Sequence, residues 1–157
     1  MVQDQREKAE YLNQALVAGI SSVEDAVSWA ESVIELDDQP DAEVIEVALS
    51  RRRPDFAFGP LLDQIKGKCD RVQVTRKVLA ELLARLNSDP TAGQSIASRV
   101  YKLYAAGYLP DDIFGWEPCA LEDNFYLENV GALGPGRTAV GELRSYLARH
   151  CAAERHA

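Results

Sequence analysis

Residues 19–37 read GISSVEDAVSWAESVIELD, and this stretch carries the signals that begin, continue and end an α-helix. Ser22 stands where an N-cap hydroxyl is expected, and Glu24 and Asp25 follow in the first turn, where the helix dipole favours acidic side chains. Apolar residues then recur at helical spacing: Val23, Ala26, Val27, Ala30, Val33 and Ile34. The stretch predicts an amphipathic helix that ends near Asp37.

The same kinds of signal predict helices in most of the remaining chain. Periodicity, caps and breakers place them at about residues 3–18, 40–53, 60–67, 70–88, 90–106 and 138–153. No run of alternating β-branched residues and no Asn-Gly or Asp-Gly hairpin signal occurs. We therefore expect an all-α fold with a single domain over residues 1–157. It would form a multi-helix bundle or an irregular helical stack of about six to eight helices.

The helix predicted after Pro40 combines an apolar stripe with a basic end. Its predicted inward residues are Val44, Ile45, Ala48 and Leu49. Three arginines, Arg51 to Arg53, would close this helix at the negative end of its dipole, and Pro54 would prevent its continuation.

Residues 108–136 combine frequent breakers with large apolar side chains. Glycine and proline punctuate the segment, yet it is also rich in aromatic residues. We expect a packed, irregular loop region with short helices, because a flexible linker would not hold so many large apolar side chains. One hypothesis places an enzyme site at residues 108–126, in a concavity lined with Trp116 and Phe125 that uses Asp111, Asp112 or Glu122.

Composition restricts the classes of partner and compartment. The formal net charge of −8 disfavours nucleic acid, because phosphates would be repelled. Cys69, Cys119 and Cys151 form no CxxC pair, so we expect reduced thiols, no metal site and no cofactor. No apolar run approaches the roughly 20 residues needed to cross a bilayer, and the first residues lack a signal-peptide pattern. We expect a cytoplasmic protein without a membrane partner.

Charge is segregated along the first half of the chain. Residues 22–46 contain nine acids without a lysine or arginine, whereas residues 51–77 are mainly basic. One interpretation is two solvated helix faces that neutralise each other where they meet. The other is an acidic face that attracts a basic protein. For that interface we predict Glu24, Glu31, Glu35, Asp37, Asp38, Asp41 and Glu43.

Residues 19–30, GISSVEDAVSWA, are followed by Pro40 and by VIEVALS at 44–50. This pattern resembles the opening of small helical bacterial proteins, mostly uncharacterised, that include immunity proteins of polymorphic-toxin and contact-dependent inhibition systems. The resemblance spans about residues 19–50 and transfers no catalytic residue. It implies a protein that binds and neutralises a cognate toxin without chemistry of its own.

Three hypotheses for function follow. The first is a non-enzymatic protein-binding module, in its most specific form an immunity-type inhibitor whose acidic helices bind a basic toxin domain. The second is a regulatory or scaffold protein that self-associates through its helices. The third is the enzyme with a site at residues 108–126.

Overall fold

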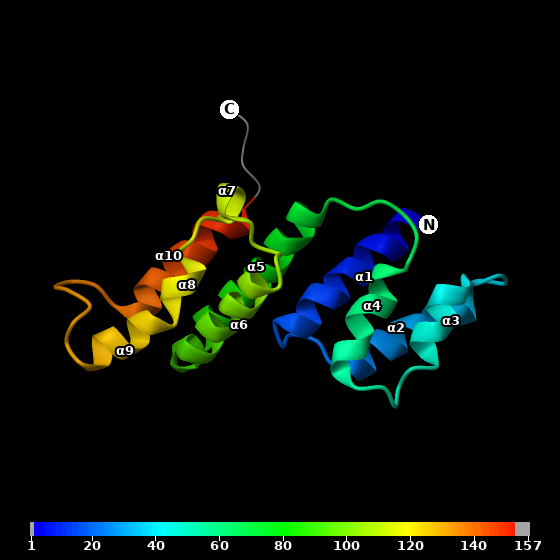
Figure 1. The fold of residues 1–157 in the computed structure, drawn as a ribbon, viewed down its shortest axis with the longest axis horizontal. Helices are drawn as coiled ribbons and strands as arrows, with labels where there is room; N and C mark the ends of the chain where they lie inside the picture. The colour runs from blue at the N-terminus through cyan, green and yellow to red at the C-terminus, as the bar shows by residue number, and fades with distance from the viewer. Residues whose placement is uncertain (1, 153–157) are drawn as a thin grey trace. The chain divides into compact units, whose positions relative to one another are not determined.

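The computed structural model describes residues 2–152, with side chains from residue 5 onward. Within this range the regular elements are α-helices and short 3-10 helices, and no strand occurs (Figure 1). The all-α prediction is confirmed. Its contacts divide the chain into two compact units, Met1–Val74 and Thr75–Ala157. That boundary falls inside one of the predicted helices, and the single-domain expectation for residues 1–157 stays a prediction.

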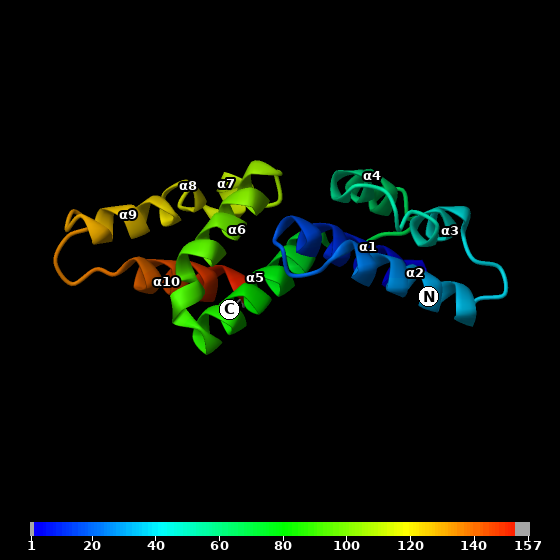
Figure 2. The same ribbon diagram turned by 90° about the horizontal axis from the view of Figure 1, so that it is seen from below.

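The first unit is a small four-helix arrangement. Its elements are α1 (Val2–Val17), α2 (Val23–Leu36), α3 (Ala42–Ala48), the 3-10 helix η1 (Asp55–Ala57) and α4 (Phe58–Asp63). The helix α3 packs against α2, and α4 packs against α1 (Figures 1 and 2). Their facing residues form one core that includes Leu12, Val27, Val44, Phe58 and Leu62.

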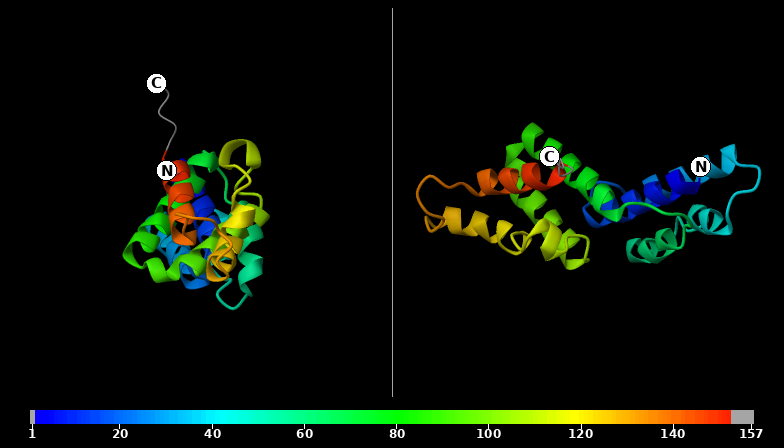
Figure 3. Two further views of the ribbon diagram at one scale, coloured as in Figure 1. Left: turned by 90° about the vertical axis from the view of Figure 1, so that its left-hand side faces the viewer. Right: turned by 90° about the horizontal axis from the view of Figure 1, so that it is seen from above.

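The second unit holds the longer α5–α6 hairpin and the C-terminal helices. Its elements are α5 (Arg71–Ser88, whose first turn belongs to the first unit), η2 (Pro90–Ala92), α6 (Gly93–Ala105), α7 (Asp111–Phe114), α8 (Pro118–Leu121), α9 (Asp123–Asn129) and α10 (Ala139–Cys151). Both α8 and α9 run alongside α10, and α6 packs against α8 and α10 (Figure 3). The short helices expected within residues 108–136 are α7, α8 and α9.

Several helices begin at the residues that the sequence predicts. The hydroxyl of Ser22 accepts a hydrogen bond from the backbone of Asp25, whose carboxylate in turn accepts from the backbone of Ser22, which completes a capping box. Asp70 accepts from the backbone of Gln73 at 3.1 Å. Thr138 accepts from the backbone of Gly141 at 3.0 Å, so the glycine-rich segment before it is a turn that leads into an N-cap.

The prediction for α3 is wrong in two respects. This helix ends at Ala48 and buries Val44 and Val47, whereas Leu49 is 81% exposed and Ile45 is 38% exposed. Just beyond the end of the helix, Ser50 is buried and donates its hydroxyl to the backbone carbonyl of Glu46 at 2.6 Å. The three arginines at residues 51–53 therefore lie in the following turn, where they do not cap the helix.

Trp29 is half-buried and packs against the core of the first unit. All three cysteines are free, with Cys119 exposed and the other two half-buried.

None of the helices in the described range combines the length and the apolar character needed to span a bilayer. Among the same residues, no group of three or more His, Cys, Asp or Glu side chains is arranged to hold a metal ion.

Candidate functional site

The structure separates the seven predicted interface acids into two groups. The first group is neutralised by the basic stretch that follows it in the sequence. Arg51 lies 3.1 Å from Glu24 and 3.1 Å from Glu31, and Lys66 lies 3.3 Å from Glu43. For these three carboxylates the basic stretch supplies the opposite charge, as the interpretation of two faces that neutralise each other expects. Such exposed pairs contribute little to stability, about 0–1 kcal/mol each.

The second group stays uncompensated. Glu35, Asp37, Asp38 and Asp41 lie at the end of α2 and in the loop to α3, and no cation of the described side chains lies within 4.0 Å of any of them. Leu36, in their midst, is 89% exposed. We call these five residues the α2–α3 acidic cluster.

The position of Glu35, Asp37 and Asp38 is electrostatically unfavourable, whereas Asp41 is the N-cap of α3, where the helix dipole favours an acid. The C-terminal end of a helix carries about half a negative charge, which disfavours acidic side chains and favours basic ones. The last turn of α2 contains no basic residue, and its C-cap is Asp37. The carboxylate of Asp37 accepts one hydrogen bond, from the backbone N–H of Gln39 at 3.0 Å. The chain thus keeps a repulsion here that a cationic partner would relieve.

Two carboxyls on α2 and α3 have pKa values lowered by local partners. The pKa of Glu43 lies below its ordinary value of 4.5, first because its own backbone N–H donates to the carboxylate and then because Lys66 is near, although burial acts in the other direction. The pKa of Asp25 is likewise lowered, by hydrogen bonds from the backbone and then the hydroxyl of Ser22. Both carboxyls already have partners, so neither is available as a free attachment point.

A buried polar network on α1 was not anticipated. Glu10 is 1% exposed, and its carboxylate contacts Arg6 at 2.7 Å, Arg71 at 2.9 Å and the amide of Gln14 at 2.9 Å. Arg6 also donates to the backbone carbonyl of Leu62 at 2.9 Å. The sequence contained one signal, since residues 6, 10 and 14 are spaced by four and share a helix face. The network connects α1 to α4, and we interpret its role as structural.

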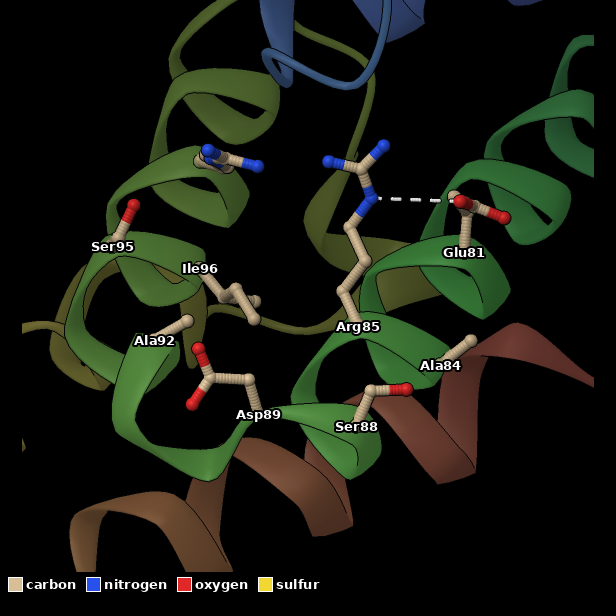
Figure 4. A pocket seen from close by; sticks show the side chains of 9 residues that line it. Glu81, Ala84, Arg85, Ser88, Asp89, Ala92, Ser95 and Ile96 are labelled. Carbon is tan, nitrogen blue, oxygen red and sulfur yellow. Dashed lines mark hydrogen bonds and ion pairs between the residues drawn. The ribbon is translucent and has the colours of Figure 1, made fainter.

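A pocket of about 450 Å³ lies between α5 and α6 in the second unit (Figure 4). From α5 and the turn after it come Glu81, Ala84, Arg85, Ser88 and Asp89, and from η2 and α6 come Ala92, Ser95, Ile96 and Arg99. Its volume falls in the range of about 300–1,000 Å³ that is usual for small-molecule sites. Sequence reasoning gave no indication of this pocket, because its residues are ordinary for two packed helices.

A smaller pocket of about 210 Å³ lies between α8–α9 and α10. Trp116, Glu117 and Tyr146 are among the residues that line it. The Oη of Tyr146 and the Oε2 of Glu117 are both buried without a hydrogen-bond partner. Burial, and then the nearby charge of Glu117, raises the pKa of Tyr146, so this hydroxyl is a poor proton donor in acid–base chemistry.

The residues proposed for an enzyme site do not converge in this smaller pocket. Trp116 lines it, but Asp111, Asp112, Glu122 and Phe125 do not. Asp111 and Asp112 lie in the exposed first turn of α7, and neither side chain caps this helix. The ring of Phe125 packs instead on Gly93, where a Cβ would lie only 2.9 Å from it. Hydrogen bonding by Cys119 and then Asp111 raises the pKa of Tyr104 to about 12.

Comparison of the chain with models of protein families, with curated proteins and with solved structures finds no match.

Proposed function

We propose that this protein is a non-enzymatic protein-binding module whose α2–α3 acidic cluster binds a basic protein. The observation that carries the proposal is the placement of three uncompensated carboxylates around an exposed leucine at the negative end of α2, with a fourth, Asp41, in the loop that follows. The charges of Glu35, Asp37 and Asp38 are opposed by the helix dipole, and a docked cation would offset this repulsion by attracting both the carboxylates and the helix end. In its most specific form, the proposal is that the protein is an immunity-type inhibitor that neutralises a cognate toxin.

The cluster contains both charged and apolar side chains, and the two kinds have different roles at many protein interfaces. Charges around a contact accelerate encounter and select the partner, whereas a buried apolar side chain slows dissociation. Here the carboxylates of Glu35 and Asp38 would act on the association rate. Leu36 would act on the dissociation rate, because its side chain is 89% exposed and would bury apolar surface when it inserts into a partner.

The test compares two variants of equal net charge. Glu35→Lys with Asp38→Lys reverses two charges of the cluster, and each reversal adds two charge units to the net −8. Asp112→Lys with Asp123→Lys makes the same change on exposed acids of the second unit. Both variants and the wild-type chain are used as bait to capture a partner protein in the native organism. The rate at which the captured partner associates with each chain is then measured from low to high salt.

We expect the wild-type chain and the Asp112/Asp123 variant to capture the same basic protein, and the Glu35/Asp38 variant to lose it. The association rate should fall with salt only where the cluster is intact. Equal capture and equal rates for both variants would refute the role of the cluster. Stoichiometric inhibition of a toxic activity of the partner would support the immunity-type form, and a partner without such activity would contradict it.

A variant of the apolar residue separates binding from folding. Leu36→Ser should leave the free energy of unfolding within about 0.5 kcal/mol of wild type, because the side chain is exposed. It should nevertheless increase the dissociation rate of the complex. An unchanged dissociation rate would show that Leu36 lies outside the interface.

A further inference from the structure

The charged side chains that line the pocket between α5 and α6 indicate the class of ligand that would fit it. Two cationic and two anionic side chains line it: Arg85, Arg99, Glu81 and Asp89. Arg85 and Glu81 neutralise each other, since the guanidinium Nε lies 3.5 Å from the carboxylate across one turn of α5 (Figure 4). The charges that remain for a ligand are those of Arg99 and Asp89.

Neither remaining charge has an opposite charge as its partner. Arg99 is half-buried on α6, and none of the described carboxylates lies within 4.0 Å of its guanidinium. Asp89 accepts hydrogen bonds from the backbone N–H and the hydroxyl of Thr91 through Oδ1, but no described cation lies within 4.0 Å. A ligand carboxylate on Arg99 would form a charge-assisted hydrogen bond, which is about twice as strong as a neutral one.

The two charges lie at different distances from the turn of the hairpin. Asp89 is at the turn between the helices, directly before η2. Arg99 follows the start of α6 at Gly93 by six residues, which corresponds to about 9 Å along the helix axis. Its side chain leans back toward the turn, because Cα–Cβ bonds in a helix point toward the N-terminus. The ligand must therefore carry its two charges several ångströms apart.

The space between the charges is lined by small and polar side chains. Ala84, Ala92 and Ile96 supply apolar surface, and Ser88 and Ser95 supply hydroxyls (Figure 4). The figure shows the carboxylate of Asp89 well separated from the guanidinium of Arg85, with Ile96 between the two helices. A compact ligand with a polar, uncharged middle and small substituents would fit such a lining.

We infer that this pocket binds a short zwitterionic peptide, with its carboxylate on Arg99 and its ammonium group toward Asp89. A free α-amino acid with an uncharged side chain is too short, because its ammonium and carboxylate groups are both attached to Cα. Two extended residues span about 7 Å, which is comparable to the axial distance of about 9 Å between Gly93 and Arg99 once the backward lean of the Arg99 side chain is included. This site is in the second unit, whereas the α2–α3 acidic cluster is in the first, so the inference is independent of the proposed function.

The experiment uses the full chain and the dipeptide Ala-Ala, followed by isothermal titration calorimetry and by backbone amide shifts in nuclear magnetic resonance. Two analogues each remove one charge: N-acetyl-Ala-Ala lacks the ammonium group, and Ala-Ala amide lacks the carboxylate. We expect the wild-type chain to bind Ala-Ala about tenfold more tightly than either analogue, as hydrogen bonds to charged groups imply. Amide shifts should concentrate at residues 84–99.

Two variants assign each contact, and a third serves as the matched control. Arg99→Gln should bind Ala-Ala and Ala-Ala amide with equal affinity, and Asp89→Asn should bind Ala-Ala and N-acetyl-Ala-Ala with equal affinity. Asparagine preserves the cap that Asp89 provides to η2. Arg52→Gln, an exposed arginine of the first unit, should behave as wild type.

The inference would be overturned by three results. One is the absence of amide shifts in this pocket at Ala-Ala concentrations on the order of 10 mM, tenfold above a millimolar Kd. Another is equal binding of Ala-Ala and both analogues to the wild-type chain, which would show that neither charge is recognised. A third is tight binding of acetate with no gain from the ammonium group, which would identify a simple anion site. The analogue series uses only the wild-type chain, so it decides the question even if a variant does not fold.

Discussion

The buried network on α1 allows a test of how burial changes the contribution of an ion pair to the free energy of unfolding. Glu10→Gln removes the negative charge at nearly constant volume and leaves Arg6, whose side chain is 14% exposed, without its 2.7 Å partner. For comparison, Arg137 and Glu142 on the surface also lie 2.7 Å apart, with side chains 52% and 36% exposed. Glu142→Gln is therefore a control with the same distance between the charged atoms and a different degree of burial.

The expected cost of Glu10→Gln follows from the individual contacts. The buried, charge-assisted contact with Arg6 contributes about 1.5–3 kcal/mol. The contact with Arg71, whose side chain is 57% exposed, adds at most about 1 kcal/mol because solvent screens it. Asp63 lies 3.8 Å from Arg6 and compensates part of the loss. We expect the free energy of unfolding to fall by about 3 kcal/mol, against less than about 1 kcal/mol for Glu142→Gln.

The assay is urea denaturation, since guanidinium would screen the charges under study. Each unit contains one tryptophan, which permits the two units to be followed separately. Trp29 reports on the first unit in a Trp116→Phe background, and Trp116 reports on the second in a Trp29→Phe background. The loss in Glu10→Gln should persist in about 1 M salt, whereas that in Glu142→Gln should vanish. Equal costs for the two variants would refute the argument that burial sets the energy.

Three further predictions concern the backbone and titration. Gly115→Ala should destabilise the second unit by at least about 1 kcal/mol, because φ 74° and ψ 173° at this residue lie in a region essentially restricted to glycine; an unchanged melting temperature in calorimetry would contradict this. Ser22→Ala should cost the first unit about 1 kcal/mol in urea denaturation through loss of its capping box, and an unchanged midpoint would contradict that role. Burial, then the charge of a neighbouring arginine, lowers the pKa of His150 below 6.5, so stability should be complete above that pH and decline as the pH falls below it; an imidazole shift titrating at or above 6.5 would rule this out.

The helix boundaries illustrate what local sequence can predict. Ser22, Asp70 and Thr138 each accept a hydrogen bond from a backbone group three residues ahead, so the signal and its partner lie in the same short segment. Apolar stripes were predictable for the same reason: the helical period alone brings Val78, Leu82 and Leu86 to one face, and all three are buried.

The error at α3 shows where local reasoning fails. Leu49 continues the apolar pattern of the preceding residues, yet the helix ends one residue earlier and leaves it 81% exposed. The period identifies residues that share a face, but a helix of seven residues has too few turns to determine which face meets the core. That choice depended on how α3 packs against α2 and α4.

Local sequence was enough to predict the all-α class, the starts of the capped helices and the acidic character of residues 22–46. It could not predict which acids have a cationic partner, because Arg51 contacts Glu31 across 20 residues of chain. Only the tertiary structure decided that Glu10 is buried, through a contact with Arg71 that is 61 residues distant, and that α5 and α6 leave a pocket between Arg99 and Asp89. The two kinds of feature differ in the sequence separation of the residues involved. Caps and periodicity act within about one helical turn, whereas ion pairing, burial and pockets depend on residues that only folding brings together.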